Sequence, residues 1–159
     1  MKNSKLFYLS LLILPWLTVP LLGRKSFKKY LPATIFITTF TKAIDLFGEK
    51  KKWWRFYKGI QPLDSMNFFN FGPYFVTSLW MLKLTYGKFP FYLITNTILH
   101  ICFIYLGGVK LVSRYKIFTL ERLTKFQYLT IDFLRALLLY CFQYIINLSY
   151  NTKKLSKKD

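Results

Sequence analysis

The chain has 159 residues, of which 53% are hydrophobic and 21% aromatic, and its 24 basic and 6 acidic residues give a formal net charge of +18. Charged residues make up 19% and cluster between long uncharged runs, unlike a soluble domain with about 25% charged residues. Basic residues with many aromatics also suit nucleic-acid binding, but here they stand at the ends of apolar runs, so we expect no nucleic-acid partner. We predict an all-α integral membrane bundle of about five transmembrane helices, forming one domain over 1–150.

The first apolar run, 6–22, follows a basic start and is interrupted by Pro15 and Pro20. A signal peptide has a similar beginning, but no small-x-small cleavage site precedes Gly23 and further apolar runs follow. We therefore predict an uncleaved, proline-kinked membrane helix.

The second run, 31–47, is less apolar and includes Lys42 and Asp45, which lie three residues apart, share a face and could either pair or lie near the interface. A lone charge at the bilayer centre costs about 2.5–3.5 kcal/mol, so whether this run fully crosses stays open. The segment KKKWWRFYKG that follows combines lysine with tryptophan, as headgroup-facing loops do. We expect it to contact anionic lipid headgroups.

Two long runs, 69–86 and 89–110, form the most apolar part of the chain and predict a membrane-spanning hairpin around Gly87. Lys83 lies in the first run, where we expect it to reach toward the interface along its aliphatic stem. A contact with a substrate or ion is the alternative interpretation.

The second helix of this hairpin contains a polar stripe. Tyr92, Asn96 and His100 recur every four residues and therefore share a face. They would serve a proton relay or a ligand contact, or they would hydrogen-bond to neighbouring helices and specify packing. We favour packing.

The stretch 117–129 mixes apolar and charged positions and predicts an interfacial amphipathic helix. The last span, 129–149, contains Asp132 and Arg135 near its start, again three apart and predicted to pair. The basic tail, 151–159, is predicted to be disordered.

Signatures of catalysis are missing from the sequence. A single histidine, His100, cannot supply a His-Glu-x-x-His metal site. Asp45 and Asp132 each have a basic neighbour three residues away, unlike the carboxylates of an aspartyl dyad. Cys102 and Cys141 lie within apolar runs and suit packing. We expect no enzymatic activity and no cofactor.

Membrane orientation stays open because the basic residues are nearly balanced. With five crossings, 12 basic residues lie on the side of the N-terminus and 9 on the other, which weakly favours a cytoplasmic N-terminus. If 31–47 does not cross, the split becomes 14 against 7, with both termini outside.

The link GRKSFKKYLP, the segment KKKWWRFYKG and the hairpin LWMLKLTYGKFPFYLITN resemble those of small, uncharacterised multi-pass membrane proteins of Gram-positive, spore-forming bacteria. The resemblance implies a multi-pass protein of the cell membrane. That family has no assigned activity, so it transfers no functional residue.

Two functions follow as hypotheses. The first is a non-enzymatic protein that acts by helix–helix packing with itself or with a membrane-protein partner. The second is a small transporter or channel component with a polar path along 89–110. A transport path predicts that Asn96, His100 and Lys83 converge on a wet cavity, whereas packing predicts a dry, closed bundle or polar stripes that face outward toward a partner.

Overall fold

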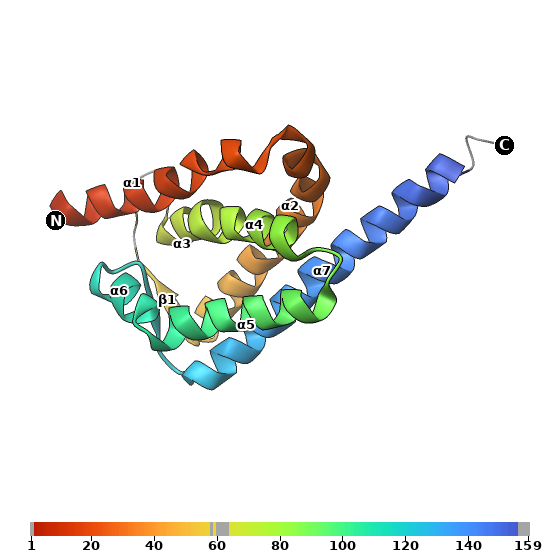
Figure 1. The fold of residues 1–159 in the computed structure, drawn as a ribbon. Helices are drawn as coiled ribbons and strands as arrows, with labels where there is room; N and C mark the ends of the chain where they lie inside the picture. Colours follow the sequence, from red (N-terminus) through yellow and green to blue (C-terminus); the bar gives the residue numbers. More distant parts are fainter. Residues whose placement is uncertain (1, 58, 60–63, 156–159) are drawn as a thin grey trace.

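The computed structural model describes residues 2–57, 59 and 64–155. This part of the chain is predominantly helical, which confirms the all-α class (Figure 1). The helices are α1 (Lys2–Leu17), the 3₁₀ turn η1 (Val19–Leu22), α2 (Arg24–Lys50), α3 (Ser65–Phe69), the π-helical segment η2 (Asn70–Tyr74), α4 (Phe75–Thr85), α5 (Phe89–Tyr105), α6 (Gly108–Arg114) and α7 (Lys125–Leu155). Two short strands, β1 (Trp54–Phe56) and β2 (Phe118–Leu120), pair antiparallel with Arg55 opposite Thr119.

The connections between helices gather at two ends of the bundle. At one end, the β1–β2 pair joins the loops that follow α2 and α6, and the Tyr8 hydroxyl of α1 donates to the Lys116 carbonyl. At the other end, Lys83 Nζ at the last turn of α4 donates to the Leu21 carbonyl at 2.9 Å. The long helices therefore run back and forth between these ends, with the N- and C-terminal helix ends on opposite sides (Figure 1).

The helix that starts the hairpin contains a π-helical turn. α3, η2 and α4 follow each other without a break over 65–85, and Pro73 lies inside η2. At Gly72, an added Cβ would lie 2.5 Å from the carbonyl oxygen of Leu11, so α1 contacts this turn backbone to backbone. π-helical turns inside α-helices occur frequently at functional sites.

Two apolar clusters form the core. One lies between α2, α4, α5 and α7 and contains Ile37, Leu79, Leu82 and Leu139. The other lies at the strand end, where Trp54 and Phe118 pack with parts of α1, α5 and α7. The strand pair thus packs against one end of the helical bundle and covers it.

The outer surface is unusually apolar, and the interior is unusually polar. Ile94 and Ile98 of α5, Leu134 and Ile145 of α7, and Leu14 of α1 are all more than half exposed. The interior holds buried polar and charged side chains in turn, namely Thr34, Thr38, Thr41, Asp45, Asn70, Asn96, Asp132, Arg135 and Gln143. Water-soluble domains show the opposite distribution.

One helix, Lys125–Thr152, is long and apolar enough to cross a bilayer. Helices α5 and α6 pass the same test as a pair, with a bend of 45° between them. The described residues therefore contain one or two candidate membrane spans by length and composition alone, which gives weak support for a membrane location.

The interfacial helix expected over 117–129 was wrong. Ile117 and Phe118 are buried in the strand-end cluster, and α7 begins at Lys125. Thr124 and Gln127 cap that start reciprocally, because each side chain bonds to the other's backbone N–H. This is a capping box with glutamine at its third position.

The disordered tail expected over 151–159 was wrong for its first part. α7 continues as a helix to Leu155, and the remainder, 156–159, lies outside the described residues.

Candidate functional site

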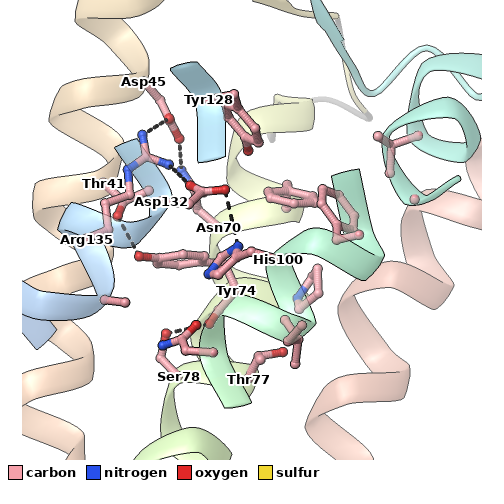
Figure 2. A pocket seen from close by; sticks show the side chains of 18 of the residues that line it. Thr41, Asp45, Asn70, Tyr74, Thr77, Ser78, His100, Tyr128, Asp132 and Arg135 are labelled. Atoms are coloured by element: carbon pink, nitrogen blue, oxygen red, sulfur yellow. Dashed lines mark hydrogen bonds and ion pairs between the residues drawn. The ribbon is translucent and has the colours of Figure 1, made fainter. Parts of the chain in front are cut away.

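The interior contains a charged network that joins α2 to α7. Arg135 donates from Nη2 to Asp45 Oδ1 at 2.9 Å and from Nη1 to Asp132 Oδ1 at 3.3 Å (Figure 2). All three residues are at least 95% buried. One guanidinium thus bridges two carboxylates from different helices, as its fork of donors permits.

The remaining carboxylate oxygens also have partners. Asn70 Nδ2 donates to Asp45 Oδ2 at 2.9 Å, and His100 Nδ1 lies 3.2 Å from Asp132 Oδ2 (Figure 2). The His100 side chain is 18% exposed, against 4% for Asp132. The network therefore extends from the fully buried α2–α7 contact outward to α5.

Aromatic residues support the network from the strand end. Trp54 Nε1 donates to the Asp45 backbone carbonyl at 3.1 Å, and the Arg135 guanidinium lies 5.8 Å from the centre of the Trp54 ring. On the opposite side, Thr41 of α2 bonds to the Tyr74 hydroxyl at 2.9 Å (Figure 2). The π turn thus supplies two side chains to this region, Asn70 and Tyr74.

A cavity of about 290 Å³ lies beside the network. Its polar wall includes Asp45, Asp132, Arg135, His100 and Asn96, and apolar and aromatic side chains form the rest. This volume is close to the lower limit of small-molecule sites, about 300–1,000 Å³. A mostly apolar hollow with a few convergent polar groups is the usual form of such sites.

A second cavity of about 170 Å³ lies between α5 and α7. Asn96, His100 and Ala136 line both cavities. These three residues therefore separate the two hollows, and the polar stripe of α5 forms most of that partition.

The predicted candidate residues divide into two groups. Asp45, Asn96, His100, Asp132 and Arg135 meet at the cavity. Tyr92 of the same α5 stripe is buried and does not line the cavity, and its hydroxyl donates to the Ala136 carbonyl at 2.7 Å. Lys42 and Lys83 lie elsewhere, over the rings of Phe71 and Trp80.

The expected Lys42–Asp45 pair was wrong. Asp45 pairs with Arg135 within the described residues, and the Lys42 ammonium lies 5.9 Å from the centre of the Phe71 ring. The reason is that Asp45 belongs to the buried face of α2, while Lys42 belongs to its outer part. Arg135, in contrast, has both Asp132 on its own helix and Asp45 across the bundle.

Sequence reasoning missed Asn70 and Tyr74. Both belong to the π turn, and their meeting with Asp45 and Thr41 depends on long-range packing of η2 against α2. Gly72-Pro73 was the available signal, because proline inside a helical run marks a local irregularity.

No three histidine, cysteine or acidic side chains gather as metal ligands in the part of the chain that the structure describes. Comparison of the chain with protein-family models, with curated proteins and with solved structures found no match. The chemistry of the site must therefore be argued from its own residues.

Replacing Tyr92 by phenylalanine removes the bond to Ala136 and leaves the ring in place. The Ala136 carbonyl keeps its backbone bond within α7, so Tyr92→Phe is expected to cost about 0.5–1.5 kcal/mol of folding free energy, the net contribution of one hydrogen bond. Thermal unfolding in detergent, followed by tryptophan fluorescence, measures this loss. Tyr144→Phe, at a half-exposed ring of α7, is the matched control and should change little.

Proposed function

We propose that the protein is a multi-pass membrane protein of the cell membrane that crosses the bilayer five times, through α1, α2, α3–α4, α5 and α7. The exposed isoleucine and leucine side chains on these helices support lipid contact. Their back-and-forth course between two ends supports five crossings over four. The Lys- and Trp-rich loop after α2 then meets anionic headgroups.

Within this architecture, we propose that the protein binds a small molecule in the cavity beside the charged network, as a transporter or carrier component. The observation that supports this is the meeting of Asn96 and His100 with the Asp45–Arg135–Asp132 bridge at one hollow. A purely structural bundle has no need of buried charges, which are costly in a membrane interior. The role is non-enzymatic.

The expected convergence of Lys83 with Asn96 and His100 was wrong, so the proposed path does not include Lys83. Its ammonium donates to the Leu21 carbonyl at the far end of the bundle, so it belongs to the interface. The proposed path therefore runs from the cavity past Asn96 and His100 toward α7, and Lys83 anchors the helix end.

Thiol labelling tests the wet cavity. In a variant with Cys102 and Cys141 replaced by alanine, Ser78→Cys adds a nearly isosteric thiol at the cavity wall. Ile98→Cys on α5 is the matched control, because its side chain is 56% exposed on the outer face. With protein in liposomes, a membrane-impermeant thiosulfonate should label the first variant and leave the second unlabelled, since thiols in lipid stay protonated and unreactive.

Each other result has a definite meaning. Absence of labelling at Ser78→Cys would contradict a water-filled cavity and favour the packing hypothesis. Labelling of both variants would contradict the lipid-facing position of Ile98 and, with it, the membrane architecture.

Assembly with a second copy or with another membrane protein is the second candidate function. Helix α7 favours this candidate, because only 28% of its most apolar stretch is buried against the rest of the chain. Light scattering of the protein in detergent would report a dimer or higher oligomer if copies of the chain pair through α7, and a monomer if they do not.

A further inference from the structure

The charged network beside the cavity has more acidic than basic groups. Asp45 and Asp132 contribute two carboxylates, and Arg135 contributes one guanidinium. Among these three side chains, the carboxylates outnumber the guanidinium by one. A buried excess charge is strongly destabilising unless a partner neutralises it. The cavity is the place from which a mobile partner can do so.

The wall of the cavity also contains an unused acceptor. Asn70 is 1% exposed, and its Oδ1 has no hydrogen-bond partner among the described residues. Its Nδ2 donates to Asp45, which fixes the orientation of the amide and leaves Oδ1 as the free atom. An unpaired buried acceptor costs about 1–3 kcal/mol, so the site favours a ligand with an N–H or O–H donor.

Aromatic rings form much of the remaining wall. Phe7, Phe69, Phe103, Tyr74 and Tyr128 line the cavity, and they come from separate elements of the fold. The faces of aromatic rings attract organic cations, more strongly where water is excluded. They also fit the apolar body of a small amphiphile.

One feature of the wall favours the opposite charge. Arg135 Nε has no hydrogen-bond partner among the described residues, and its N–H could donate to an oxygen of an anion. The guanidinium charge, however, is already matched by Asp45 at 2.9 Å and Asp132 at 3.3 Å. An anion would therefore approach two carboxylates for each guanidinium, and a neutral water is the better partner for this N–H.

We propose that the ligand of this cavity is a small organic cation, a protonated amine with an apolar, ring-sized body. The inference rests on the proposed function and names its ligand class. The ammonium lies against Asp132 and the free oxygen of Asn70, and the apolar body lies among the aromatic rings.

Three probes of one shape and different charge test this proposal. They are 2-phenylethylamine, which is cationic at neutral pH, the neutral 2-phenylethanol and the anionic 3-phenylpropionate. Binding is measured by calorimetry on the full chain in nanodiscs, with empty nanodiscs subtracted. The amine should bind about tenfold tighter than the alcohol, from one uncompensated charge at an intermediate dielectric. The chain's net charge of +18 favours the anion over long range, so a preference for the amine must come from the cavity.

Two variants test whether the preference for the amine comes from the charged network. Asp132→Asn removes the excess charge. The variant should still bind the alcohol, and it should bind the amine with about the same affinity as the alcohol. Lys83→Gln changes a polar residue at the far end of the bundle and should leave all three affinities unchanged. If Asp132→Asn fails to fold, the comparison of the three probes on the natural chain still decides.

Equal binding of alcohol and amine, or tighter binding of the anion, would overturn the organic cation and leave the proposed small-molecule function standing. Binding of none of the three, with Ser78→Cys labelled, would also overturn it and would leave a wet cavity of another purpose. Failure of the labelling itself would overturn the proposed function.

Discussion

Arg135→Met is expected to destabilise the fold by about 3–5 kcal/mol. The change removes the bridge between Asp45 and Asp132 and leaves two carboxylates in the protein interior without a counter-charge. Thermal unfolding in detergent, followed by tryptophan fluorescence, measures the loss. Arg135→Lys should fare little better, because an ammonium lacks the fork that reaches both acids.

A triple variant separates the cost of unpaired charge from that of lost packing. Asp45→Asn and Asp132→Asn, combined with Arg135→Met, remove all three charges and should restore most of the stability. If the triple variant is as unstable as Arg135→Met alone, the side-chain shape and not the charge balance is responsible. In that case our account of the network is wrong.

Gly72→Ala is expected to destabilise the fold by about 1–3 kcal/mol through overpacking. The new Cβ would lie 2.5 Å from the Leu11 carbonyl oxygen, and a backbone atom cannot turn away as a side chain can. Helix α1 must therefore shift. The loss should exceed the gain of about 1 kcal/mol that alanine brings to an ordinary helix.

The same unfolding measurement reports this loss. Leu84→Ala, at an exposed position of α4, is the control and should stay within about 0.5 kcal/mol. A stabilised Gly72→Ala variant would mean that α1 lies farther from the π turn than the structure places it. Because Phe7 and Leu11 of α1 line the cavity, a shift of this helix should also weaken binding of the probes.

Much of the helical layout could be predicted from local sequence. Apolar runs gave the approximate positions of α1, α2, α4, α5 and α7, because hydropathy and helix-ending residues are local signals. The antiparallel strand pair could not be found in this way, since β1 and β2 are three residues each and pair across more than 60 positions. The start of α7 could have been found, because Thr124 and Gln127 have capping-box spacing.

The site was predictable only in part. The i, i+3 spacing of Asp132 and Arg135 indicates a contact, and the structure has one. The same rule failed for Lys42 and Asp45, because it does not tell which of two neighbours faces the bundle. The decisive contact, Arg135 to Asp45, joins residues 90 positions apart and depends on how α2 packs against α7. Local spacing contains no information on such a contact.

The small strand pair has a consequence for insertion into a bilayer. In the proposed membrane architecture, the pairing of β1 with β2 requires the polypeptide between them to cross the bilayer an even number of times. The α1–α2 hairpin precedes the strand pair and a single helix, α7, follows it, so the proposed five crossings would place the two termini on opposite faces of the membrane. Reversing the direction in which one helix crosses would require the β1–β2 hydrogen bonds to break. The distribution of basic residues over the loops, which is nearly balanced, would then decide only between two orientations of the whole molecule, one the reverse of the other.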